Sequence, residues 1–285
     1  MSETTSHPRV HSVAAAETDS PAPAATALLA LAAAALLSHA ARRAIRACAD
    51  SLATSGPPTT IESPAAIRTR RAAAAARVES LVAAAELPAL EAARVRALAA
   101  PLAAPQMTSD PAALRAAVEK VARAGDGAAV AAAGSDLCTL LDRQHETVFA
   151  RALVEACAAS CVSAGFPHVE TRRGEGVARV VALDGTGHAL VSEVRIDAAG
   201  APSLATEALG WPDRGCQGAL DRFDRELAAR GVRTDPPRRQ PARRGRGLGE
   251  LAGHPAIAAE AAGTARERRI PAARRRTALA RKSEN

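Results

Sequence analysis

The feature that most constrains this chain is a change of pattern between His168 and Val232. Two β-rich runs, 176–184 and 188–196, flank a short glycine-containing turn. Such runs joined by a short Gly turn predict a β-hairpin. Shorter runs at 168–173 and 203–209 would add one strand on either side. The stretch therefore predicts an antiparallel meander of three or four strands.

Helical patterns lie on both sides of these strands. One begins near Ser135 or Asp136 and runs to about Ala164, and the other runs from about Arg214 to Arg230. The second has a clean apolar stripe made by Leu220, Phe223 and Leu227. The fold class predicted for residues 131–232 is α+β, a small antiparallel meander packed with two helices.

Residues 23–130 form an alanine-rich region with helical patterning. Pro88 should divide a helical stretch at about 64–100, and Ser109-Asp110-Pro111 is a typical helix start. The apolar fraction is 48%, but the chain has only three Phe, one Trp and no Tyr, so we expect a small hydrophobic core. We expect a loose helical bundle whose alanine-lined faces bind a partner protein or a second copy.

A membrane segment is the alternative for part of this region. No charge occurs from Pro21 to Ala41, a span long enough to cross a bilayer. Alanine is only weakly apolar, however, and Ser38 and His39 interrupt the run. We favour a helix that does not enter a membrane, although the sequence does not decide whether residues 24–41 ever contact one.

The two ends of the chain have compositions typical of disorder. Residues 1–22 are rich in Ser, Thr, Pro and Ala, and 233–285 form a basic Arg/Pro/Gly-rich tail. From Arg233 onward, fourteen Arg and Lys face five Asp and Glu, a net charge of +9. The rest of the chain carries a net charge of −2, so the tail is electrostatically distinct.

The sequence excludes several classes of function. Five sparse cysteines do not form a disulfide framework, and the first residues do not resemble a signal peptide, so we expect a cytoplasmic protein. The Gly-rich pieces lack dinucleotide or P-loop spacing. Cys157 and Cys161 share a helix face, but no second Cys or His pair accompanies them. We expect no metal and no cofactor.

One candidate for catalysis is Cys216. It falls in the first turn of the last predicted helix, where amide groups and the helix dipole stabilise a thiolate. His188 and Glu207 on the strands could complete a nucleophilic site as base and orienting carboxylate. The alternative is a packed cysteine, with a glutamate on the solvated face of the sheet.

The basic tail offers a second candidate site. Without exposed aromatic platforms, any nucleic-acid binding would be unspecific, salt-sensitive and directed at the phosphate backbone. The arginines available for it are Arg238, Arg239, Arg243, Arg244 and Arg246. The alternative is a solvated tail with no dedicated partner.

Residues 180–232 carry a pattern of a Gly-turn hairpin, a Glu, a Gly and a Cys that opens a helix. The residues concerned are Asp184-Gly185, Glu207, Gly210 and Gly215-Cys216-Gln217. The pattern resembles small uncharacterised bacterial β-hairpin-plus-helix domains of unknown function. Gly215 stands where that pattern usually has Ser, and Asp213-Arg214 replaces a further Gly. Such domains are often encoded beside AAA-type ATPases, so the resemblance implies an accessory role and an ATPase partner.

Three hypotheses follow from the sequence. The first is a non-enzymatic accessory or protein-interaction protein built on the α+β domain. The second is a nucleic-acid-associated protein that acts through the basic tail, and the third is a cysteine-dependent enzyme that uses Cys216.

Overall fold

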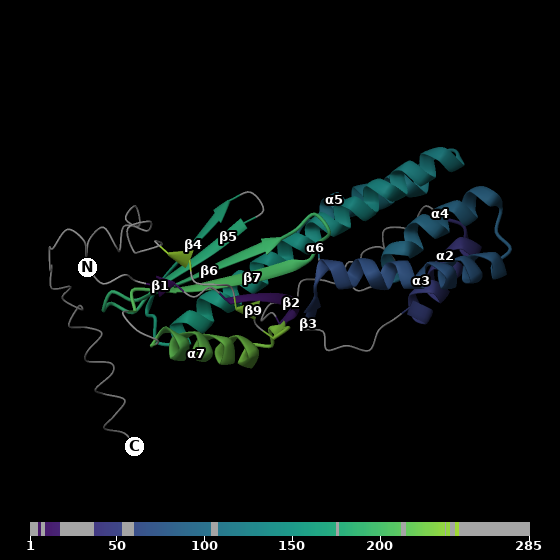
Figure 1. Ribbon diagram of the computed structural model, residues 1–285. Coiled ribbons are helices and arrows are strands. Elements are labelled where there is room, and N and C mark those ends of the chain that lie inside the picture. Colours follow the sequence, from purple (N-terminus) through teal and green to yellow (C-terminus); the bar gives the residue numbers. More distant parts are fainter. Residues whose placement is uncertain are drawn as a thin grey trace, which may run out of the picture.

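The structure, a computed structural model, describes residues 5–6, 9–17, 37–52, 60–103, 108–174, 177–211, 215–236, 238–239 and 243–244. It confirms the predicted α+β class. An antiparallel sheet with two covering helices lies at one end, and a bundle of helices lies at the other (Figure 1). The long helix α6 (Gly127–Ser163) runs through both parts.

The predicted meander is present with four strands. They are β4 (His168–Gly174), β5 (Val177–Leu183), β6 (Ala189–Ile196) and β7 (Pro202–Leu209), each antiparallel to the next. Gly185 and Gly187 in the β5–β6 turn have positive φ angles of 82° and 92°. Only glycine adopts this backbone readily, which is why the sequence pattern located the turn.

The sheet is wider than the sequence predicts. Strand β2 (Arg9–Glu17) pairs with β7 through its first half and with β3 (Thr60–Glu62) through its second. The order across the sheet is β3-β2-β7-β6-β5-β4. The expectation of disorder for residues 1–22 is therefore wrong for Arg9–Glu17, because a strand far away in the sequence supplies its hydrogen-bond partners.

Part of the tail also forms strands. β8 (Arg233–Thr234) and β9 (Arg238–Arg239) pair with β2, and β10 (Arg243–Arg244) pairs with β1 (Thr5–Ser6). Backbone hydrogen bonds to a sheet edge require no apolar side chains, so an Arg-rich segment can join it. The expectation of a disordered tail is wrong for these residues, and 245–285 lie outside the described part of the chain.

The alanine-rich region is a helical bundle. Its elements are α2 (His39–Leu52), α3 (Pro64–Ala84), α4 (Ala89–Ala99), the 3₁₀ turn η1 (Ala100–Ala103), α5 (Pro111–Arg123) and the first half of α6. Pro88 divides α3 from α4 as predicted, and the Asp110 side chain caps α5. None of the described helices is long and apolar enough to span a membrane, and residues 24–36 lie outside that description.

The start of α6 corrects the predicted domain boundary at residue 131. Asp126 accepts a hydrogen bond from the Ala129 amide at 2.8 Å and caps a helix that begins at Gly127. Gly125 and Gly127 therefore do not mark a domain boundary, because Asp126, which lies between them, is the N-cap of α6. Leu141 of α6 belongs to the bundle core, and Phe149, two turns later, belongs to the sheet core. One helix thus contributes to both cores.

Helices α6 and α7 (Cys216–Ala229) cover one face of the sheet. The predicted stripe on α7 is buried, and it packs with Phe149 and Leu153 of α6 and with Leu190 and Leu204 of the strands. A side chain on a strand therefore faces this helical layer or, at the next residue, the opposite face of the sheet. This alternation decides where each candidate residue points.

Candidate functional site

The structure does not bring the predicted trio Cys216, His188 and Glu207 together. Cys216 is the first residue of α7, is 1% exposed and packs in the sheet core. Glu207 stands between Thr206 and Ala208, both of which are buried on the helical side. Glu207 therefore lies on the opposite face of the sheet from Cys216. The arrangement favours the interpretation of Cys216 as a packed residue.

His188 has a different carboxylate partner, Asp184, in the β5–β6 turn. Its Nδ1 lies 2.7 Å from Asp184 Oδ2, and its ring stacks on Trp211 with centroids 4.5 Å apart. Asp184 also accepts hydrogen bonds from the Thr186 amide and hydroxyl, each at 2.7 Å. Burial opposes ionisation of Asp184, but the hydrogen bonds from Thr186 and His188 outweigh it and lower its pKa to about 2.

This cluster fixes the turn against the end of β7. A Cβ at Gly210 would lie 2.2 Å from the carbonyl oxygen of Gly187, so the two backbone segments are in direct contact. The Asp-Gly-Thr-Gly-His sequence contained the signal for the Asp184–His188 pair, because the turn returns residue 188 to residue 184. The carboxylate that orients His188 is thus Asp184 and not the predicted Glu207.

We predict that Asp184→Asn lowers stability in a pH-dependent way. The folded pKa is about 2 and the ordinary value is 3.8, so on acidification the unfolded chain takes up the proton first. The ionised Asp184 thus stabilises the fold above pH 3.8, and this contribution disappears as the pH falls towards 2. Denaturation followed by Trp211 fluorescence should show the gap between the two proteins closing over that range. A gap that stays constant contradicts the assignment.

A buried ionic cluster joins the N-terminal strand to α7. Arg9 of β2 is 5% exposed, and its guanidinium lies 2.7 Å from Asp221, 2.8 Å from Asp224 and 2.9 Å from the Gln217 side-chain oxygen. Burial tends to lower the pKa of Arg9, but the two carboxylates raise it overall, so Arg9 is cationic. His11, two residues along β2, lies 3.2 Å from Asp224. The cluster holds β2 in place beneath α7.

The arginines proposed for nucleic-acid binding lie mostly within strands. Arg238 and Arg239 are in β9, opposite Val10 and Arg9, and Arg243 and Arg244 are in β10, opposite Ser6 and Thr5. Arg246 lies outside the described residues. The pairing brings four of the five arginines to the N-terminal strands, and phosphate binding stays a prediction.

Two cysteines of α6, Cys157 and Cys161, are inert packing residues. Cys157 and Cys161 are fully buried in the sheet core. Burial raises the pKa of Cys161 to about 12, and burial together with the neighbouring Cys161 raises the pKa of Cys157 further still. Both thiols are therefore protonated at neutral pH. In the part of the chain that the structure describes, no three His, Cys, Asp or Glu residues are grouped to hold a metal.

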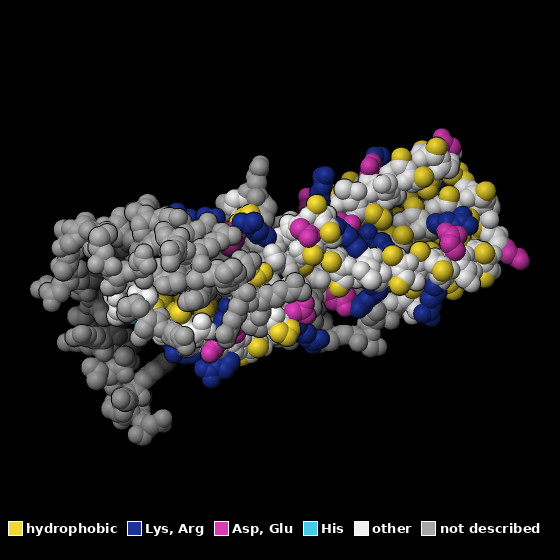
Figure 2. All heavy atoms as spheres, viewed as in Figure 1, with side chains coloured by type: hydrophobic (Ala, Val, Ile, Leu, Met, Phe, Trp, Pro, Cys, Tyr) yellow, Lys and Arg dark blue, Asp and Glu magenta, His cyan; other side chains and the backbone are white. Residues whose placement is uncertain are grey.

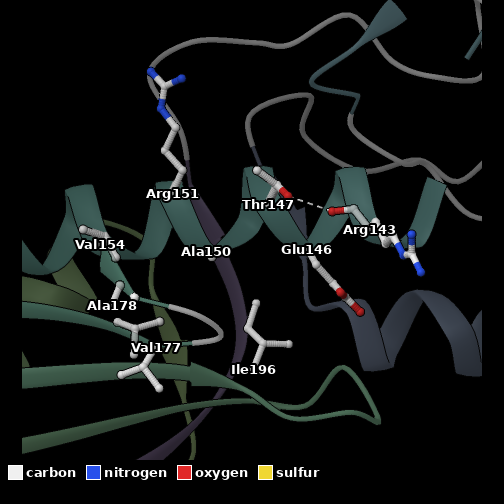
Figure 3. A pocket seen from close by; sticks show the side chains of 11 residues that line it. Arg143, Glu146, Thr147, Ala150, Arg151, Val154, Val177, Ala178 and Ile196 are labelled. Carbon is white, nitrogen blue, oxygen red and sulfur yellow. Dashed lines mark hydrogen bonds between the residues drawn. The ribbon is translucent and has the colours of Figure 1, made fainter. Parts of the chain in front are cut away.

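A groove of about 380 Å³ lies where α6 leaves the sheet (Figure 3). We call it the α6 groove. Its lining is mainly aliphatic, with Ala150 and Val154 from α6, Val177 and Ala178 from β5, and Val194 and Ile196 from β6. Gly174, the last residue of β4, also lines it. These residues are far apart in sequence, and none of them formed a recognisable motif.

The charged residues that line the α6 groove differ in whether they form ion pairs. Glu146 is paired with Arg68 of α3, and Arg151 is paired with Glu155 at 2.8 Å and points away from the sheet in Figure 3. Arg143 makes no ion pair with any residue that the structure describes. The Thr147 hydroxyl donates to the Arg143 carbonyl at 2.9 Å and is used within the helix. An aliphatic groove with one cation that pairs with no described residue is suited to a ligand with an apolar body and an anionic end.

No family model, curated protein or solved structure matches this chain. The resemblance of residues 180–232 to small bacterial hairpin-plus-helix domains is thus a prediction, and any function is argued from the sites described above.

Proposed function

We propose that the chain is a non-enzymatic protein-interaction protein whose α6 groove binds the carboxyl-terminal residues of a partner polypeptide. The observation that carries this proposal is the aliphatic lining of the groove beside Arg143, whose guanidinium forms no ion pair within the described part of the chain. An aliphatic last side chain would lie against Val177, Val194 and Ile196. Its terminal carboxylate would bind Arg143.

The size of the groove favours a peptide end. About 380 Å³ is near the lower limit for small-molecule pockets and holds one or two aliphatic side chains. Gly174, the last residue of β4, has no side chain, so a peptide end can lie close to it in the groove. The lining is suited to binding and not to covalent chemistry, because Thr147 bonds to its own helix and Glu146 is ion-paired.

The groove replaces the N-terminal helices as the proposed partner surface. In the bundle, the apolar faces of these helices pack against one another. Figure 2 shows apolar side chains over the bundle interspersed with basic and acidic ones. Among described residues, the one strongly exposed large apolar side chain is Val162, at 53%. We keep a cytoplasmic location and an AAA-type ATPase partner as proposals that rest on the resemblance and the sequence.

Fluorescence anisotropy of labelled pentapeptides that end in leucine tests the proposal. The peptide with a free carboxylate should bind the full chain, and its carboxamide form should bind more weakly. Arg143→Ala should weaken binding of the free acid by about 10-fold or more, because a hydrogen bond to a charged group contributes about 1.5–3 kcal/mol. The same substitution should leave binding of the amide unchanged.

Two variants and one competitor complete the experiment. Ala150→Trp fills the groove and should abolish binding of both peptides, whereas Arg77→Ala, an exposed arginine on α3, should have no effect. Octanoate separates a peptide site from an acyl site. If octanoate binds and neither peptide does, or if acid and amide bind equally, the proposal is wrong.

A further inference from the structure

Strand β4 is the last strand of the described sheet on the side of β5. Among the residues that the structure describes, its seven residues pair only with β5. At the opposite side of the sheet the corresponding edge is occupied by the short strands β3, β8 and β9. An exposed strand of this length presents a row of backbone donors and acceptors that another strand can pair with.

The charges of β4 are self-complementary. Glu170 and Arg172 lie on the same face, on either side of Thr171, and Arg172 Nε donates to Glu170 Oε1 at 2.9 Å. In an antiparallel pair centred on Thr171, Glu170 of each copy stands opposite Arg172 of the other. Oppositely charged residues that face each other across two paired strands stabilise the pairing, and each such pair of residues contributes about 0.2–1 kcal/mol.

The neighbouring strand makes this arrangement more favourable. Within one chain, Arg172 stands directly opposite Arg179 of β5, which places two like charges side by side. Arg179 is paired with Glu193 at 2.8 Å on its other side. A glutamate from a second copy on the outer side of Arg172 would place one glutamate beside each of the two arginines.

We propose that a second copy of this chain pairs with β4 in antiparallel orientation about a two-fold axis at Thr171. The two sheets then form one continuous sheet, and all seven residues of β4 have a partner. The same register places His168 of the second copy opposite Gly174, at the rim of the α6 groove. The inference is independent of the proposed function, because the pairing requires no peptide.

Sedimentation equilibrium of the full chain and its charge-reversal variants tests the pairing. The wild-type chain should show a mass that rises with concentration towards that of a dimer. E170R and R172E should each be monomeric, since like charges would then face each other. An equimolar mixture of the two should recover the dimer, as should the double variant E170R/R172E. A wild-type chain that is monomeric throughout, or single variants that associate as strongly as it does, would overturn the proposal.

Cross-linking tests the register. T171C should join to itself through a short bis-maleimide, because the two residues at position 171 face each other on the two-fold axis. H168C should not, because the two copies of residue 168 lie at opposite ends of the pair. Both positions are exposed in the single chain. Efficient self-cross-linking of H168C without T171C would show that the chains associate in another way.

Discussion

Replacing Arg9 with methionine is expected to lower the free energy of unfolding by about 1–3 kcal/mol, because it leaves the partly buried Asp224 carboxylate without its cation. Asp224 is the main cause, since its side chain is 23% exposed whereas that of Asp221 is 62% exposed. Urea denaturation followed by circular dichroism measures the effect. Arg42→Met on the exposed surface of α2 is the matched control and should change stability by less than about 0.5 kcal/mol.

A second substitution separates charge from packing in this cluster. If the loss comes from an uncompensated charge, adding Asp224→Leu to Arg9→Met should recover much of the stability, because an apolar replacement removes the unpaired group. If the double variant is as unstable as the sum of two single losses, the Arg9 side chain acts through packing alone. The ionic account of the attachment of β2 to α7 is then wrong.

Truncation of Leu141 to alanine in the bundle is expected to destabilise the sheet end of the molecule as well. Leu141 is fully buried in the bundle core, and its loss should cost about 2–5 kcal/mol. Because α6 contributes to both cores, the two parts should unfold in one transition. The single Trp, Trp211, packs against the sheet core and reports on that end, and circular dichroism is dominated by the helices.

Comparing the fluorescence and circular dichroism transitions shows whether the two cores unfold together. In wild-type protein and in Leu141→Ala, the fluorescence and circular dichroism transitions should coincide and shift together. Phe149→Ala, on the sheet half of α6, should shift both by a similar amount, about 3–5 kcal/mol. A fluorescence midpoint that does not move in Leu141→Ala would mean that α6 does not couple the two cores.

Local signals in the sequence predicted much of the sheet and the helices. The glycine turn, the alternation on either side of it and the stripe on α7 each depend on residues close together in the chain. The N-cap Asp110 and the break at Pro88 are local in the same sense. Each of these patterns spans only a few residues, and the structure contains the helix, strand or turn that the pattern predicts.

The errors have a different physical origin. Among the side chains of β2 that the structure describes, the buried ones are Arg9, His11, Val13 and Ala16, so only two of them are apolar. Arg9 and His11 are buried beneath α7, where Asp224 lies close to both. The strands of the tail depend in turn on β2. Pairing between segments so far apart in the chain, such as Arg9 with Thr206, leaves no periodic pattern in either segment.

The candidate sites also differ in whether their residues are close together in the sequence. Asp184 and His188 lie within five residues of each other, so their pairing could be predicted from the sequence. The α6 groove combines one face of a helix with the ends of three strands, and nothing in the sequence distinguishes Arg143 from other exposed arginines. Such a site becomes visible only once the chain is folded.

The most direct test of the proposed function is photo-cross-linking with a leucine-terminated peptide that carries a benzophenone near its free carboxylate. The proposal predicts adducts on the α6 groove, within residues 143–154 of α6 and on Val177, Ala178 or Ile196, and their loss in Ala150→Trp. Adducts that map to the bundle or to the β5–β6 turn, with none in the groove, would contradict it.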